Sequence, residues 1–299
     1  MDPITRSFYE FKFELAFLRK KGNEFEDFFS DIMGKVHPAD FMRVRPWGPF
    51  GDRKNDGYLK SERIIFQVYA PNEMTSALAI AKIDEDFIGA LPFWKDHFDT
   101  WIFVHNSAAG LGPDVTKKLL NLSTAHDPEV SSWGQEELRR KVFELNAPDL
   151  ASLLGYAPTL RDMLDLGLDS LAPVLDQIAI MPAPSEPDLR PPPADKIKRN
   201  MLSAHVETLL KAGMARADLV KSFFYTQPER QDEIAESFRQ RYDSLRSSGM
   251  GPDEIFSELQ RYAGGERTPS PTRQSAVLAV LAFYFEECDI FERAEGRDL

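Results

Sequence analysis

The sequence has 299 residues, 42% of them hydrophobic, which is enough to form two ordinary hydrophobic cores. Its formal net charge of −12 argues against extended, nonspecific attachment to nucleic acid, because such binding requires lysine and arginine to neutralise phosphates. A single cysteine, Cys288, excludes a disulfide or a zinc site built on cysteine pairs, and no apolar run reaches bilayer length, so we expect a cytoplasmic protein without a secretion signal or a membrane span.

The first 150 residues carry the mixed helix and strand signals of an α/β domain. Apolar residues spaced three and four apart between Phe8 and Met33, interrupted by Gly22, predict two helices. The β-branched and aromatic alternation of residues 64–69 predicts a strand, and Asn72 is a good cap for the helix that follows. Further signals predict an extended stretch at 41–44, a turn at 51–57, a strand at 101–104 and helices at 114–122 and 134–145. This order predicts a mixed sheet covered by helices.

The rest of the chain is predicted to be helical, with one interruption. Residues 151–181 form a helical extension that is broken by Gly155 and Pro158. Six prolines lie between residues 182 and 193, and such a stretch is stiff and extended, so 182–195 is the expected linker. Residues 196–299 show no strand signal, which predicts an all-α domain with helices at 203–212, 215–224, 230–247, 252–262 and 274–291.

A candidate metal site lies around the turn at 51–57 and the strand after it. Metal-dependent phosphodiester hydrolysis needs a carboxylate at the end of one strand and a second oxygen donor on the neighbouring strand, with Mg²⁺ held between them. Asp56 and Gln67 have this placement. A lysine is expected two residues after the second donor, on the same face of the strand, but Tyr69 occupies that position.

These residues resemble the Mrr-type branch of the PD-(D/E)XK nuclease family, over roughly residues 8–145. The motifs that carry the resemblance are Gly22-Asn-Glu-Phe-Glu26, Gly51-Asp52, Asn55-Asp56-Gly57 and Phe66-Gln67. The resemblance implies a Mg²⁺-dependent endonuclease acting on DNA, with Asp56 and Gln67 as metal ligands and Glu26 as the helix carboxylate. Because tyrosine supplies no fixed positive charge at neutral pH, Tyr69 implies either an inactive site or a cation borrowed from the next helix, such as Lys82.

The C-terminal half resembles a second family, the helical C-terminal modules of effectors in bacterial ABC-three-component conflict systems. The residues that carry this resemblance are Asn200-Met-Leu-Ser203, Leu210-Lys-Ala-Gly-Met214, Ile255-Phe256, Ala263-Gly-Gly265 and Phe285-Glu-Glu-Cys-Asp-Ile-Phe-Glu292. The resemblance implies that this half docks the chain onto a partner ATPase complex in antiviral or plasmid-conflict defence. The chain has no Gly-rich phosphate loop of the Walker type, so nucleotide hydrolysis would come from the partner.

Three functions remain open from the sequence. The first is a divergent nuclease effector, and the second is an inactive interaction protein that keeps the fold and couples to the ATPase complex. The third is a structural protein whose halves pack together, in which Asp52, Asn55 and Asp56 merely form a tight turn. A nuclease needs a basic surface, and basic residues that could supply it concentrate in the first sixty positions: Arg19, Lys20, Lys21, Arg43, Arg45, Arg53, Lys54 and Lys60.

Overall fold

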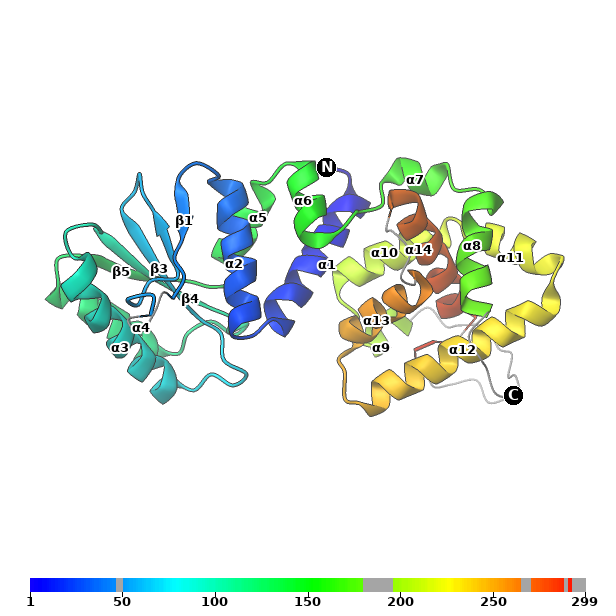
Figure 1. The fold of residues 1–299 in the computed structure, drawn as a ribbon. Helices are drawn as coiled ribbons and strands as arrows, with labels where there is room; N and C mark the ends of the chain where they lie inside the picture. The colour runs from blue at the N-terminus through cyan, green and yellow to red at the C-terminus, as the bar shows by residue number, and fades with distance from the viewer. Residues whose placement is uncertain (47–50, 180–195, 265–269, 288–289, 292–299) are drawn as a thin grey trace. The chain divides into compact units, whose positions relative to one another are not determined.

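The chain forms two compact units in the computed structural model, which describes residues 1–46, 51–179, 196–264, 270–287 and 290–291 (Figure 1). One unit consists of Phe13–Leu153. The other consists of Met1–Lys12 together with Leu154–Leu299. Helix α1 (Pro3–Arg19) therefore contributes its first residues to the second unit and its last residues to the first.

The unit formed by Phe13–Leu153 is built on a five-stranded mixed sheet in the order β1-β2-β3-β4-β5. The strands β1, β2 and β3 pair antiparallel, whereas β3, β4 and β5 pair parallel. Their bounds are β1 Phe41–Arg43, β2 Gly57–Leu59, β3 Ile64–Tyr69, β4 Thr100–His105 and β5 Glu129–Trp133.

Helices cover both faces of this sheet. Figure 1 shows α2 (Asn23–Val36) and α5 (Gln135–Phe143) on one side, and α3 (Ser76–Trp94) and α4 (Pro113–Ala125) on the other. The short helix α6 (Ala147–Leu154) follows α5. The α/β class predicted for this half of the sequence is thus confirmed.

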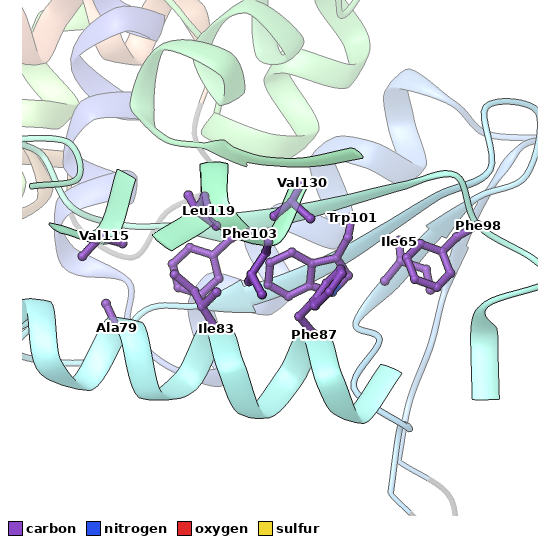
Figure 2. Close-up of a cluster of buried hydrophobic side chains, with 11 residues drawn as sticks. Ile65, Ala79, Ile83, Phe87, Phe98, Trp101, Phe103, Val115, Leu119 and Val130 are labelled. Atoms are coloured by element: carbon purple, nitrogen blue, oxygen red, sulfur yellow. The ribbon is translucent and has the colours of Figure 1, made fainter. Parts of the chain in front are cut away.

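The alternation of β3 divides its side chains between the two faces. Phe66 points toward α2, where its ring lies 5.3 Å from that of Phe29. Ile65 points the other way, into the cluster shown in Figure 2, with Ile83 and Phe87 of α3 and Trp101 and Phe103 of β4. Gln67 and Tyr69 share the face of Ile65, which places the candidate metal donor on the α3 side of the sheet.

The start of α3 and the strand β5 differ from the sequence prediction. Helix α3 begins at Ser76 rather than near Asn72, because the hydroxyl of Thr75 accepts a hydrogen bond from the backbone nitrogen of Leu78 and caps the helix. Strand β5 was not predicted, because it contains Ser131 and Ser132 and buries only Val130, so its sequence lacks the apolar alternation of a strand.

The second unit is helical, and its described residues contain no strand. This confirms the predicted all-α class. The helix α14 lies at its centre, since every residue from Ser275 to Phe285 is buried. Among the described residues, no helix has both the length and the apolar character that a bilayer crossing requires. The helices are α7 Leu160–Leu164, α8 Leu168–Ala179, α9 Lys196–Arg199, α10 Ala204–Met214, α11 Ala217–Tyr225, α12 Pro228–Ser247, α13 Pro252–Gly264 and α14 Pro271–Glu286.

The helical extension expected at 151–181 is divided between the units. Helix α6 lies in the sheet-containing unit, whereas α7 and α8 lie in the same unit as the helices that follow. Helix α8 packs against α12, α13 and α14. The residues that it buries there are Leu171, Val174, Leu175 and Ile178. The expected linker at 182–195 lies outside the described residues.

A glycine allows a close contact between two helices of the helical unit. A Cβ atom at Gly213 of α10 would lie 2.2 Å from the backbone oxygen of Leu278 and 2.8 Å from the Cβ of Ala282, both in α14. No real Cβ approaches a backbone oxygen so closely, so the two helix backbones meet at this distance only because residue 213 has no side chain.

We expect Gly213→Ala to lower the free energy of unfolding of the helical unit by about 2–3 kcal/mol, because α10 and α14 must separate. Hydrogen exchange of α10 and α14 measures this opening. Gly34→Ala in α2 is the matched control, since nothing lies within 4 Å of its Cβ position and alanine favours helix by up to about 1 kcal/mol. Equal exchange rates in wild type and Gly213→Ala would show that the helices do not touch here.

Candidate active site

Asp56 and Gln67 lie side by side on neighbouring strands. The backbone nitrogen of Asp56 donates to the oxygen of Phe66 over 2.9 Å, which extends the β2–β3 ladder by one residue and sets Asp56 opposite Gln67. Oδ2 of Asp56 accepts from Nε2 of Gln67 at 2.8 Å and from the backbone nitrogen of Val68 at 2.6 Å. The structure thus brings together the two residues that the sequence suggested as metal ligands.

This pair is almost sealed from solvent, with Asp56 6% and Gln67 5% exposed. Burial, together with the smaller effect of the negative charges of Glu26, Asp52 and Asp86, raises the pKa of Asp56 to about 7 against the opposing hydrogen bond from Val68. A carboxyl group with a pKa near 7 binds and releases protons at physiological pH, a property that is common among catalytic groups.

Glu26 lies on the other side of the sheet from α3, in the layer formed by α2 and α5. It lies in the first turn of α2, and one of its carboxylate oxygens accepts from Nη2 of Arg43 in β1 at 3.1 Å. Arg43 also bonds to the carboxylate of Asp27. The charge of Glu26 reaches Asp56 electrostatically, but no hydrogen bond joins the two carboxyl groups.

Lys82 does not bond to the Asp56–Gln67 pair. Its Nζ donates instead to Oδ1 of Asp86, one turn further along α3, at 2.9 Å. Asp86 is fully buried, and Nζ of Lys54 reaches the same oxygen at 3.1 Å. The sequence prediction missed Asp86, and it named Lys54 only as one residue of a possible basic surface. A signal for Asp86 does exist, because it is a charged residue within the apolar helical stripe of Ala79, Ile83, Phe87 and Ala90.

Tyr69 is part of the hydrophobic packing rather than of the polar group. Its ring lies 5.9 Å from that of Phe103 and packs on the cluster between α3 and the sheet. The position two residues after Gln67 therefore supplies apolar contact area, and any cation near Asp56 must come from another element.

The oxygen donors present fit Mg²⁺. Oε1 of Gln67 and Oδ2 of Asp86 are buried acceptors without a hydrogen-bond partner, and buried oxygens without partners are uncommon. In the described part of the chain, no three His, Cys, Asp or Glu side chains converge closely enough to hold a metal ion. Mg²⁺ does not require such a cluster, because it commonly binds through one or two carboxylates and keeps several waters. Asp56 and Gln67 would hold it.

A polar cleft of about 440 Å³ opens at the carboxyl ends of β4 and β5. His105 lines it and stands beside Tyr69 in the parallel register, so the cleft and the Asp56–Gln67 pair lie toward the same edge of the sheet. Burial lowers the pKa of His105 to about 4, and its Nδ1 accepts from the backbone nitrogen of Ser107 at 3.2 Å. His105 is therefore neutral and holds its proton on Nε2. No motif in the sequence marks His105 as a site residue.

Residues 169–292 match the family model of C-terminal domain 10 of the ABC-three component systems. The helical C-terminal region is a domain of this family. The match begins in α8 and runs past α14, and it confirms the resemblance that the sequence indicated for this half. Neither a curated protein nor a solved structure matches the chain. The PD-(D/E)XK resemblance of the other half stays a prediction.

The raised pKa of Asp56 makes the stability of the sheet-containing unit depend on pH. Its folded value of about 7 exceeds the ordinary 3.8, so the folded state binds the proton more tightly, and stability falls as pH rises from about 4 to about 7. We expect Asp56→Asn to remove this loss, which amounts to roughly 4 kcal/mol at most. One asparagine oxygen can accept both hydrogen bonds that Oδ2 accepts now.

Denaturant unfolding followed by tryptophan fluorescence measures this effect, because all four tryptophans lie within residues 13–153. The free energy of unfolding of Asp56→Asn should exceed that of wild type by a large amount at pH 8, and this difference should shrink toward pH 4. An advantage that is constant with pH would mean that Asp56 does not titrate in this range.

Proposed function

We propose that this chain is an effector of a bacterial defence system of the ABC-three-component type, with a divergent Mg²⁺-dependent nuclease domain that acts on DNA. The observation that carries the nuclease proposal is the buried contact between Asp56 and Gln67 on adjacent antiparallel strands. The mixed sheet with a helix on each face also supports it, because the PD-(D/E)XK resemblance implies such an architecture.

Under this proposal, the residues of the candidate site have the following roles. Asp56 and Gln67 hold the cation, and Asp56 does so in its ionised form, so binding strengthens as pH rises through about 7. Glu26, fixed by Arg43, orients a ligand or a water molecule. A bound Mg²⁺ supplies Lewis-acid polarisation of a phosphoryl oxygen and activation of water. Lys82 and its neighbours supply positive charge in place of the lysine that Tyr69 replaces.

A second candidate is an inactive interaction protein with the same fold. Two contacts favour it: the amide nitrogen of Gln67, rather than its oxygen, faces Asp56, and Lys82 is bonded to Asp86. In this case the carboxyl–amide pair is a structural element between β2 and β3. The chain would then act only through its partners.

The C-terminal domain supports a docking role in both cases. Its family consists of C-terminal domains of three-component systems, so its partner would be another component of the same system, with the ATPase complex as our proposal. Tyr225 at the end of α11 is 91% exposed and lies within the matched region. Exposed aromatic residues are enriched among the residues that dominate binding energy at interfaces.

We expect Asp56→Ala to reduce Mg²⁺-dependent DNA cleavage by on the order of 100-fold or more, because it removes the principal ligand. The assay contains the full chain and the other components of its system, with and without EDTA. Asp99→Ala is the control, since Asp99 is an exposed carboxylate at the opposite end of β4, paired with Arg63. Cleavage that persists in Asp56→Ala rules out this site. A complete system without any cleavage favours the inactive candidate.

We expect Tyr225→Glu to weaken binding to the ATPase component about tenfold, without changing the thermal unfolding of the chain. Binding can be measured by calorimetry or by pull-down with purified components. Tyr156→Glu provides the control, because Tyr156 is also exposed but lies outside the matched region. If both variants bind like wild type, the partner uses another face of the domain.

A further inference from the structure

Two lysines from different elements converge on one buried carboxylate. Lys82 lies on α3, and Lys54 lies in the turn before β2. Both ammonium groups bond to Oδ1 of Asp86, which is fully buried. A buried carboxylate needs compensating charge, so Asp86 holds the two cations beside each other. The side chains of Lys54 and Lys82 are 31% and 30% exposed, so they also reach solvent.

The turn that carries Lys54 is held in an unusual conformation. Arg53 and Lys54 have φ angles of 58° and 63°, in the left-handed region that residues with a Cβ seldom adopt. The indole nitrogen of Trp94 donates to the backbone oxygen of Arg53 at 3.0 Å, which ties the turn to the end of α3. Strained backbone of this kind is found at ligand sites more often than elsewhere.

Gly89 leaves room for the aliphatic part of the Lys54 side chain to lie across α3. A Cβ atom at this position would lie 2.9 Å from Cγ of Lys54 and 3.6 Å from its Cε. Gly89 lies one turn after Asp86 on the same side of the helix, so the absence of a side chain there lets the lysine lie flat on α3 and reach the carboxylate.

An ammonium group has three N–H donors, and the carboxylates around these lysines do not use them all. Glu85 also pairs with Lys54, but its side chain is 64% exposed, and such a surface pair contributes little. We propose that Lys54 and Lys82, held together by Asp86, form a binding site for a phosphate of the nucleic-acid backbone, from which the phosphate displaces Glu85. The proposal deepens the nuclease function and rests on it for the choice of ligand.

The surroundings favour nucleic acid over a small phosphate. Lys54 precedes Asp56 by two residues, which places a bound phosphate near the candidate metal ligands. The guanidinium of Arg53 lies 5.1 Å from the ring centre of Phe93, which is 53% exposed. Exposed aromatic rings beside cations are the usual surfaces on which unpaired bases stack. Arg43 and Arg45 of the same basic segment bond to the carboxylate of Asp27, on the α2 side of the sheet.

The test is binding of a fluorescently labelled oligonucleotide, single-stranded and duplex, to the full chain at low salt in EDTA. We expect Lys54→Met and Lys82→Met each to weaken binding about fivefold to tenfold and to reduce the slope of log Kobs against log salt concentration by about one. Each single variant leaves Asp86 with one cation. Glu85→Gln removes the competing carboxylate and should tighten binding.

Two further variants separate binding from folding. Gly89→Ala should weaken binding by displacing Lys54, while alanine in α3 keeps or raises stability. Lys118→Met removes the same charge from α4, where Lys118 pairs with Asp84, and should bind like wild type. Wild type that binds no oligonucleotide, or equal weakening in Lys54→Met and Lys118→Met, overturns the proposal.

The same variants distinguish this proposal from the nuclease function. Binding that depends on Lys54 and Lys82, without cleavage in the complete system, supports the phosphate site and contradicts catalysis. Cleavage that depends on Asp56, with unchanged binding in Lys54→Met and Lys82→Met, supports catalysis and contradicts the phosphate site.

Discussion

The hydrogen bonds from Gln67 and Val68 to one oxygen of Asp56 are the contacts on which the candidate site depends. They form because β2 and β3 are antiparallel and in register, so that the residue before β2 lies opposite the fourth residue of β3. Within a nearly dry environment these bonds fix the carboxyl group, and burial keeps its proton affinity high. Any cation that binds here must compete with this proton, so metal binding and protonation are coupled.

The charges around Asp56 are arranged in two layers. On the α2 side, Arg43 compensates Glu26, and on the α3 side, two lysines compensate Asp86. Glu26 and Asp86 thus each have a basic partner from another element, which limits the repulsion that these carboxylates would otherwise produce. The sheet between them keeps the two layers apart, so a substrate phosphate could engage the lysines without disturbing the ion pair of Glu26.

The sequence allowed the prediction of those features that depend on local patterns. The α/β class, the all-α class and the nearness of Asp56 to Gln67 follow from apolar spacing, turn residues and strand alternation. Strand β5 was not predicted because Ser131 and Ser132 are polar. The start of α3 was predicted too early because Thr75, and not Asn72, caps the helix. The convergence of Lys54 on Asp86 and the contact of Gly213 with Leu278 join residues far apart in the chain, and no local pattern indicates them.

The helical unit contains both the first twelve residues of this chain and the residues from 154 onward. Phe8 and Phe11 of α1 are buried, and the ring of Phe11 lies 5.6 Å from that of Phe256 in α13. During synthesis, residues 13–153 can fold as soon as they leave the ribosome, whereas Phe11 must wait until Phe256 has been translated. The aromatic start of α1 therefore gains its contact with α13 only after most of the chain has been synthesised.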